Sequence, residues 1–120
     1  MKKPIVYIAC PYTKGDVAVN INNAIKAADE VARHGMIPYV PILRHLYHLI
    51  SPHPYEFWTE NDIEIMLRFD VIYRIQGESS GADHECKVAQ GHCIPVFMNI
   101  ESLGRWYKEK IESSGSADVT

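Results

Sequence analysis

The sequence places an acidic residue, Asp62, on the otherwise apolar face of a predicted helix. Trp58, Ile65 and Phe69 recur at helical spacing, and position 62 falls on the same stripe. An ionised carboxylate facing a packed surface is costly unless it is paired or used for function. Burial would raise its pKa and let Asp62 act as an acid. The alternative is a solvated Asp62, on a helix whose periodicity is displaced by one position.

A second carboxylate, Glu85, lies in the first turns of the next predicted helix, beside its buried face. Ala82, Cys86 and Ala89 mark that face at helical spacing. The helix dipole favours negative charge there by roughly 0.3–1 kcal/mol, so we expect Glu85 to stay ionised. An ionised carboxylate at the edge of a pocket suits nucleophilic attack or stabilisation of a developing cation. The alternative is a partner of the helix dipole on a solvated face.

A Gly/Ser-rich loop directly precedes this helix. Ser79, Ser80 and Gly81 supply hydroxyls and free backbone N–H groups at a helix N-terminus, which suits a bound anion such as phosphate. Ser80 and Asp83 also match a capping box, so the two serines could serve only to cap the helix. Both interpretations stay open at this point.

Strands and helices are predicted to alternate along the chain. The strands are expected at 5–9, 36–40, 70–75 and 94–98. Helices are expected from the candidate N-cap Asp16 to 34, from Pro54 to 69, from the 77–81 loop to Gly91, and over 100–111, while 41–54 is irregular or only briefly helical. This order predicts an α/β, doubly wound (flavodoxin/Rossmann-like) parallel sheet of four to five strands with helices on both faces.

The predicted topology brings three loops together at the carboxyl ends of the strands, where such folds bind ligands. These loops are 10–16, 41–54 and 76–81. The chain is expected to form one domain over 1–112, followed by a disordered tail over 113–120.

Composition excludes several classes of function. The 120 residues carry a net charge of −3, and no Lys/Arg run forms a nucleic-acid footprint, so no nucleic-acid partner is expected. No apolar run approaches membrane-spanning length, so no membrane partner is expected either. The three cysteines have no framework spacing, which is typical of reduced thiols in a cytoplasmic protein. His45, His48 and His53 lack a tight third-ligand pattern, so no metal or other cofactor is expected.

The sequence resembles the nucleoside 2-deoxyribosyltransferase family, which includes the deoxynucleoside 5′-monophosphate N-glycosidases. Asn61-Asp62, the following apolar strand, the segment GESSGADHE over 77–85 and the Ile-Pro-Val of 94–96 carry the resemblance. The opening VYIACPY over 6–12 is similar to the family's first strand and loop, usually written with Gly where Cys10 stands.

The resemblance implies roles for individual residues. Glu85 matches the nucleophile that attacks the anomeric carbon and forms a glycosyl-enzyme intermediate. Asp62 matches the residue that contacts the sugar hydroxyl or the base and assists proton transfer. Tyr7 matches an aromatic residue near the sugar, and Ser79 a phosphate-binding serine. The predicted substrate-binding residues are Tyr7, Cys10, Tyr12, His45, Ser79, Ser80 and Gly81.

Two departures from the family pattern accompany these roles. The first loop has Lys14 but no Arg for a phosphate clamp, and His84 stands where many members have Tyr. Simpler interpretations also exist, since Tyr7 suits a buried strand and Cys10 suits a core. The family's assembly implies a homodimer or higher homo-oligomer, and the aromatic residues of 39–58 could stack on a base or form a subunit contact.

Three functions are consistent with these observations. The first is hydrolysis of the N-glycosidic bond of a nucleoside or nucleoside 5′-monophosphate. The second is base exchange by a nucleoside 2-deoxyribosyltransferase, which differs in whether water reaches the glycosyl–Glu85 carbon. The third is a noncatalytic nucleotide-binding module, which would tolerate the loss of Glu85.

Overall fold

A parallel four-stranded sheet forms the centre of the protein in the computed structural model, which describes residues 2–12 and 14–118. The strands are β1 (Ile5–Ala9), β2 (Ile37–Tyr39), β3 (Val71–Arg74) and β4 (Val96–Phe97), in the spatial order β2-β1-β3-β4. All three neighbouring pairs are parallel. The predicted doubly wound α/β fold is therefore confirmed, with four strands.

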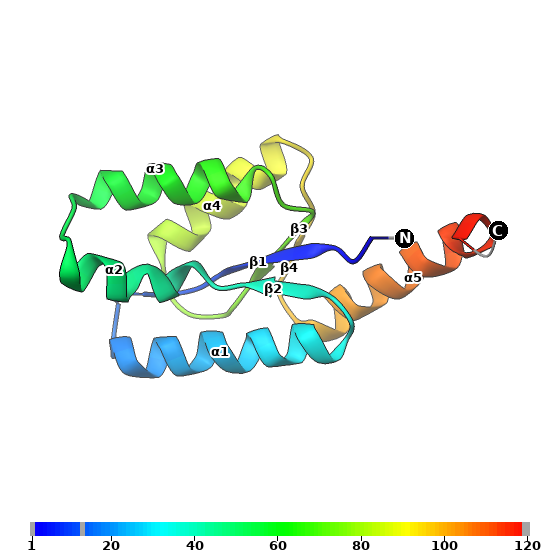
Figure 1. Ribbon diagram of the computed structural model, residues 1–120, viewed down its shortest axis with the longest axis horizontal. Coiled ribbons are helices and arrows are strands. Elements are labelled where there is room, and N and C mark those ends of the chain that lie inside the picture. The colour runs from blue at the N-terminus through cyan, green and yellow to red at the C-terminus, as the bar shows by residue number, and fades with distance from the viewer. Residues whose placement is uncertain (1, 13, 119–120) are drawn as a thin grey trace.

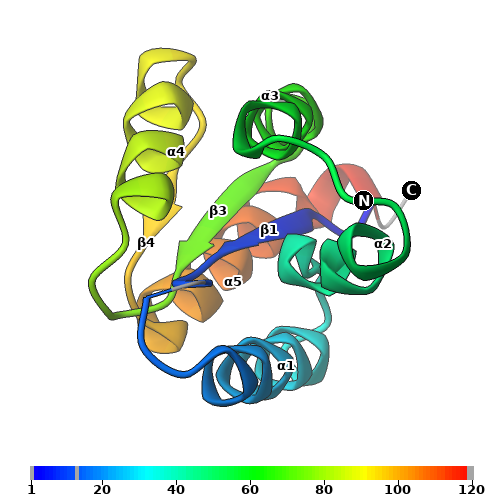
Figure 2. The ribbon, with the colours of Figure 1, turned by 90° about the vertical axis from the view of Figure 1, so that its left-hand side faces the viewer.

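Helices cover both faces of this sheet (Figures 1 and 2). Helices α1 (Val17–Arg33) and α5 (Ile100–Asp118) lie against one face, and α3 (Tyr55–Met66) and α4 (Ser80–Gly91) lie against the other. The 3-10 helix η1 (Pro41–Arg44) and the short α2 (His45–Ile50) connect β2 to α3. The segment 41–54 is thus briefly helical, as predicted.

The alternation of side chains along β1 creates two separate cores. Val6 and Ile8 point to the α1/α5 side, where they pack with Val31 and Leu103. Tyr7 and Ala9 point to the α3/α4 side, in a second cluster that includes the three residues Met66, Ala82 and Ala89. Each face of the strand therefore has its own layer of apolar packing.

The strand order reverses between β1 and β3. After β1 the chain moves outward to β2, and after β2 it crosses back to the other side of β1 to form β3. The carboxyl ends of β1 and β3 therefore lie side by side, and the chain leads from them to strands at opposite edges of the sheet. Such a switch point is where open α/β sheets leave a crevice for ligands.

Several predicted boundaries differ from the observed ones. The edge strand β4 has only two residues, because Pro95 has no N–H to donate to a ladder, although its carbonyl accepts a hydrogen bond from the Ile72 N–H. Helix α3 ends at Met66, not near Phe69, and a turn follows it. The Asp16 side chain caps α1 as predicted, accepting from the N–H groups of Ala18 and Val19 at 2.9 and 3.2 Å.

The last helix is longer than predicted. We expected α5 to end at Ile111, but it continues to Asp118, because no proline interrupts the backbone hydrogen bonding. It thus includes residues 113–118, for which the composition predicts disorder, while 119–120 lie outside the described residues. The extent of the single domain stays a prediction.

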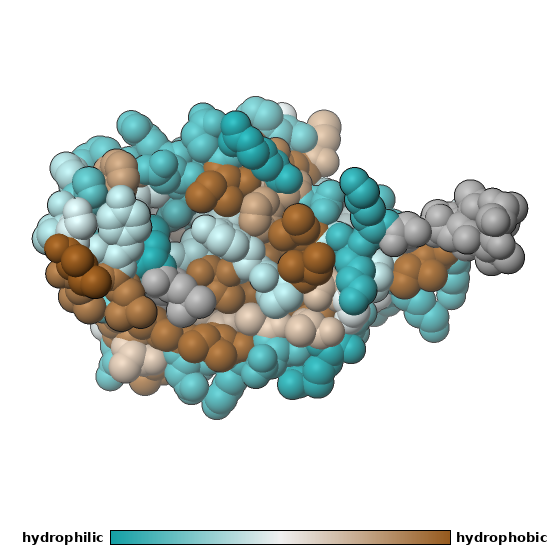
Figure 3. Space-filling model, viewed as in Figure 1, coloured by the Kyte–Doolittle hydropathy of each residue, from teal (hydrophilic) through white to brown (hydrophobic). Residues whose placement is uncertain are grey.

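Apolar side chains are exposed on the short helix α2. Leu46, Leu49 and Ile50 are 68%, 62% and 87% exposed, and apolar atoms gather over this end of the molecule in Figure 3. Within residues 2–12 and 14–118, none of the helices combines the length and the apolar character that crossing a bilayer requires. The homo-oligomer implied by the resemblance stays a prediction.

Candidate active site

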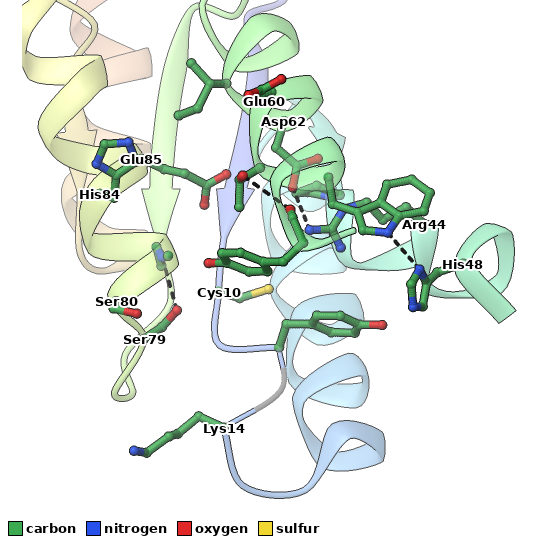
Figure 4. A pocket seen from close by; sticks show the side chains of 18 of the residues that line it. Cys10, Lys14, Arg44, His48, Glu60, Asp62, Ser79, Ser80, His84 and Glu85 are labelled. Atoms are coloured by element: carbon green, nitrogen blue, oxygen red, sulfur yellow. Dashed lines mark hydrogen bonds and ion pairs between the residues drawn. The ribbon is translucent and has the colours of Figure 1, made fainter. Parts of the chain in front are cut away.

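A cavity of about 990 Å³ opens at the carboxyl ends of β1 and β3. Its walls come from the loop after β1, from η1 and α2, from α3, and from the first turns of α4. Asp62 of α3 and Glu85 of α4 both line it and point into the same space (Figure 4). The two helices thus present the two carboxylates to a shared volume at the switch point.

Burial controls the charge of Glu85. Its half-buried carboxylate accepts a hydrogen bond from the Tyr7 hydroxyl. Desolvation raises the pKa of Glu85 to about 7, more than the Tyr7 hydrogen bond and the nearby Arg44 lower it. Desolvation thus outweighs the modest effect of the helix N-terminus, and near neutral pH Glu85 is present in both its ionised and its protonated form.

Tyr7 lies behind Glu85 and does not line the cavity. It is fully buried, and its ring contacts Tyr39 and Phe69 with centroids 6.0 and 5.7 Å apart. Burial and the neighbouring Glu85 raise the pKa of Tyr7, so its hydroxyl remains a donor. Tyr7 therefore contacts the carboxylate of Glu85, which lines the cavity, and a direct contact of Tyr7 with a substrate stays a prediction.

An arginine that the sequence interpretation missed holds Asp62. The Nη2 atom of Arg44, the last residue of η1, lies 2.8 Å from Oδ2 of Asp62. Asp62 is 7% exposed, and desolvation raises its pKa to about 6 although the Arg44 charge lowers it. The direction of this shift was predicted. The ion pair was not, and it leaves Asp62 a carboxylate at neutral pH.

The N-terminus of α4 is capped by Ser79, whose hydroxyl accepts from the Ala82 N–H at 3.1 Å. The predicted capping box of Ser80 and Asp83 is wrong, since the Asp83 carboxylate instead pairs with Arg74 at 2.9 Å. Ser79, Ser80 and Gly81 all line the cavity. The Ser79 hydroxyl can still donate its own proton to a ligand, so capping does not exclude anion binding.

Arg74, a second missed arginine, fixes the loop between β3 and α4. It is 5% exposed and donates to the carbonyls of Ile75 and Gly77 as well as to Asp83. Gly77 has a φ of +132°, and a Cβ there would lie 2.8 Å from Cγ of Pro11 in the loop after β1. The loops after β1 and β3 therefore contact each other closely at the switch point.

The remaining predicted substrate-binding residues divide into two groups. Cys10 and Tyr12 line the cavity, whereas His45 does not line it and hydrogen-bonds through its ring to the Tyr12 hydroxyl. Burial raises the pKa of the Cys10 thiol to about 12, so Cys10 is a neutral wall residue at physiological pH.

The histidines near the cavity contact aromatic rings. His48 accepts from the Trp58 indole N–H at 2.7 Å, and His53 stacks on Phe57 with centroids 3.9 Å apart. Across residues 2–12 and 14–118, no three His, Cys, Asp or Glu side chains are grouped in a way that could hold a metal ion.

The structure is similar to a solved 2-deoxyribosyltransferase from the psychrotolerant bacterium Bacillus psychrosaccharolyticus, described as a biocatalyst for the synthesis of antiviral and antitumoral nucleosides. The TM-score is 0.56 at 17% sequence identity, over 81% of this chain and 78% of the other. The two chains share a fold. No protein-family model matches the sequence, and a search of curated proteins found no match. The resemblance inferred from the sequence is thus supported at the level of the fold.

Proposed function

We propose that this protein cleaves the N-glycosidic bond of a nucleoside or nucleoside 5′-monophosphate. The observation that carries the proposal is the convergence of Glu85 and Asp62 on one cavity at the switch point of the sheet. The fold shared with a 2-deoxyribosyltransferase supports the same class of substrate. A partner of this kind is a small molecule, and the proposed compartment is the cytoplasm.

In the proposed reaction, Glu85 is the nucleophile. One of its oxygens attacks the anomeric carbon, the bond from that carbon to the base breaks, and the base leaves with the electron pair. Water then attacks the glycosyl ester and releases the sugar, and Glu85 is regenerated. A pKa of about 7 makes Glu85 a more basic nucleophile than an exposed carboxylate while much of it remains ionised at neutral pH.

Tyr7 and Asp62 have supporting roles in this proposal. The Tyr7 hydroxyl holds one oxygen of Glu85 and leaves the other for attack. Asp62, fixed by Arg44, contacts the sugar hydroxyl or the base. Ser79 and the first N–H groups of α4 are the proposed seat for a 5′-phosphate.

Base exchange is the second candidate, favoured by the activity named for the solved structure of similar fold. In that case a second base, not water, attacks the glycosyl ester. The two reactions share every step up to the intermediate, so the same residues serve both.

One experiment tests the proposal and separates the two reactions. The protein is incubated with a panel of nucleosides and 5′-monophosphates, with and without an acceptor base, and the products are separated by chromatography. Base released without acceptor supports hydrolysis, and a new nucleoside formed only with acceptor supports transfer. Binding without any turnover would contradict both and leave the noncatalytic module. Glu85→Gln is the matched control, since it keeps the size of the side chain and removes the nucleophile.

A further inference from the structure

Arg44 is a rigidly held cation in the wall of the cavity. Its side chain is 20% exposed, and its guanidinium carbon lies 5.3 Å from the ring centroid of Tyr12 and 5.4 Å from that of Trp58. The two rings are fixed in turn by His45 and His48, which hydrogen-bond to the Tyr12 hydroxyl and the Trp58 indole N–H. Packing against two anchored rings fixes the plane of the guanidinium before any ligand binds.

Most hydrogen-bond donors of Arg44 are unused. A guanidinium has five N–H donors. Among the described residues, Asp62 is the one partner of Arg44 in a hydrogen bond or ion pair, and Nε is buried without a partner. A buried donor left unpaired costs about 1–3 kcal/mol. An arginine kept only to neutralise Asp62 would have no need of a fixed orientation on the cavity wall.

The pair presents a donor directly beside an acceptor. Arg44 supplies N–H groups, and Asp62, 2.8 Å away, supplies carboxylate oxygens, with both residues lining the cavity (Figure 4). The complementary edge on a ligand is a carbonyl oxygen next to a ring N–H. Uracil, thymine, hypoxanthine and guanine have this lactam edge. Adenine and cytosine have an amino group next to an unprotonated ring nitrogen instead.

We propose that Arg44 and Asp62 together select nucleosides or nucleotides whose base has a lactam edge. This inference rests on the proposed function and names its class of substrate. Arg44 donates to the exocyclic oxygen, and Asp62 accepts from the adjacent ring N–H. A base with an amino group there places donor against donor at Arg44 and acceptor against acceptor at Asp62.

The same contact assists the departure of the base. When the bond to the anomeric carbon breaks, the electron pair stays on the base and spreads onto its carbonyl oxygens. The charge-assisted hydrogen bond from Arg44 strengthens as this negative charge develops. The departed base then takes a proton from water. No protein acid is required at that step, in agreement with Asp62 being held as a carboxylate by Arg44.

The test compares bases that differ only at this edge. Deoxyinosine is paired with deoxyadenosine and deoxyuridine with deoxycytidine, each with and without a 5′-phosphate. The kcat/KM values are measured on the wild type, and the Kd values of the same compounds on Glu85→Gln by calorimetry. A well-placed pair of hydrogen bonds discriminates between bases by roughly 1–3 kcal/mol, so we expect a preference of about 5- to 150-fold for the lactam member of each pair.

The substitution Arg44→Gln should reduce this preference to about 1 and lower kcat/KM for the lactam substrates. Arg44→Lys, which keeps the charge but loses the planar fork, should retain an intermediate preference. Arg105→Gln is the matched control, because Arg105 is an exposed arginine on α5, on the opposite face of the sheet from the cavity, and the preference should not change. The double variant Arg44→Gln/Asp62→Asn avoids a buried unpaired carboxylate and should also show no preference.

Each alternative result has a distinct meaning. Equal kcat/KM and Kd values for both members of each pair, or a preference for amino bases, would overturn the inference and leave the proposed function intact. An effect of Arg44→Gln on all monophosphates and on no nucleoside would overturn it in favour of a phosphate contact. Lactam-selective binding without turnover would support the inference and reject the proposed reaction. Neither binding nor turnover would reject both.

Discussion

The two faces of the sheet contain the same kinds of elements but are packed for different purposes. On the α1/α5 face, Val6 and Ile8 lie in a continuous apolar cluster with Val31 and Leu103. On the α3/α4 face, the neighbouring Tyr7 hydrogen-bonds to Glu85 at the edge of a cavity. One five-residue strand supplies both layers. The comparison shows a division of roles between the two faces. Apolar packing on the α1/α5 face stabilises the sheet, and the α3/α4 face can therefore keep its carboxylates partly desolvated.

The largest expected effect is the loss of turnover when Glu85 is replaced. Glu85→Ala should reduce kcat by on the order of 10³-fold or more, because no other group takes the place of the proposed nucleophile. Thermal unfolding of the variant should show a retained fold, since Glu85 lies at the cavity and not in either core cluster. Retained turnover would contradict the nucleophile assignment.

A core substitution on the opposite face should lower stability and leave turnover unchanged, the reverse of the result expected for Glu85→Ala. Leu103 is fully buried against the α1 side, so Leu103→Ala should lower the free energy of unfolding by about 2–5 kcal/mol. Chemical denaturation measures this loss, and kcat assayed well below the melting temperature should stay close to the wild-type value. A large fall in kcat would show that the two faces are not independent.

The pH dependence of stability should be dominated by the cavity face. Burial raises the pKa of Glu85 from 4.5 to about 7, so between these values the folded protein binds a proton that the unfolded chain does not. The contribution of Glu85 to stability is therefore fully present below pH 4.5 and is lost as the pH rises through about 7, a loss of about 3 kcal/mol at most. Denaturation from pH 5 to 8 should show a weaker decline in Glu85→Gln, because the Asp62 contribution remains in both proteins.

Tyr7→Phe should separate the role of the Glu85 carboxylate from that of the hydroxyl that hydrogen-bonds to it. The variant keeps the buried ring but loses the hydrogen bond to Glu85, so the pKa of Glu85 should rise further. We expect kcat/KM at pH 7 to fall by about 10- to 100-fold, as for loss of a hydrogen bond to a charged group. The pH–rate profile should move to higher pH. An unchanged profile would show that Tyr7 only packs.

Ser79→Ala should have the smallest effect and distinguishes the two interpretations of the α4 N-terminus. Loss of the cap on the Ala82 N–H should cost about 1 kcal/mol of stability in either case. If a 5′-phosphate binds there, KM should rise for monophosphates and not for nucleosides. A stability loss without a selective KM effect would leave capping as its one role.

Much of the architecture could be predicted because it depends on local patterns. Short β-branched runs bounded by turn residues located all four strands, and helical periodicity placed Asp62 on the inner face of α3. The strand lengths were less predictable. The absence of an N–H at Pro95 limits β4, although this residue was visible in the sequence.

The partners of the carboxylates could not be predicted from periodicity. Arg44 reaches Asp62 from η1, across a loop whose course depends on tertiary packing. The one feature of the sequence that pointed to Arg44 was its position after the second predicted strand, in one of the three loops expected to meet at the site. Arg74 gave a clearer signal, as a charged residue within a strand that is otherwise buried. The raised pKa of Glu85 could not be predicted, because its burial depends on the whole cavity wall.

The two tryptophans of the chain give each side of the sheet its own fluorophore. Trp58 borders the cavity with its indole on His48 and near the Arg44 cation, whereas Trp106 of α5 packs on Phe97 behind the sheet. In Trp106→Phe, Trp58 is the remaining tryptophan, and its emission should respond to occupancy of the cavity. In Trp58→Phe, Trp106 is the remaining tryptophan, and its emission should respond to unfolding of α5 from the sheet. Spectroscopy on this pair of variants can therefore follow ligand uptake and loss of the scaffold as separate optical signals.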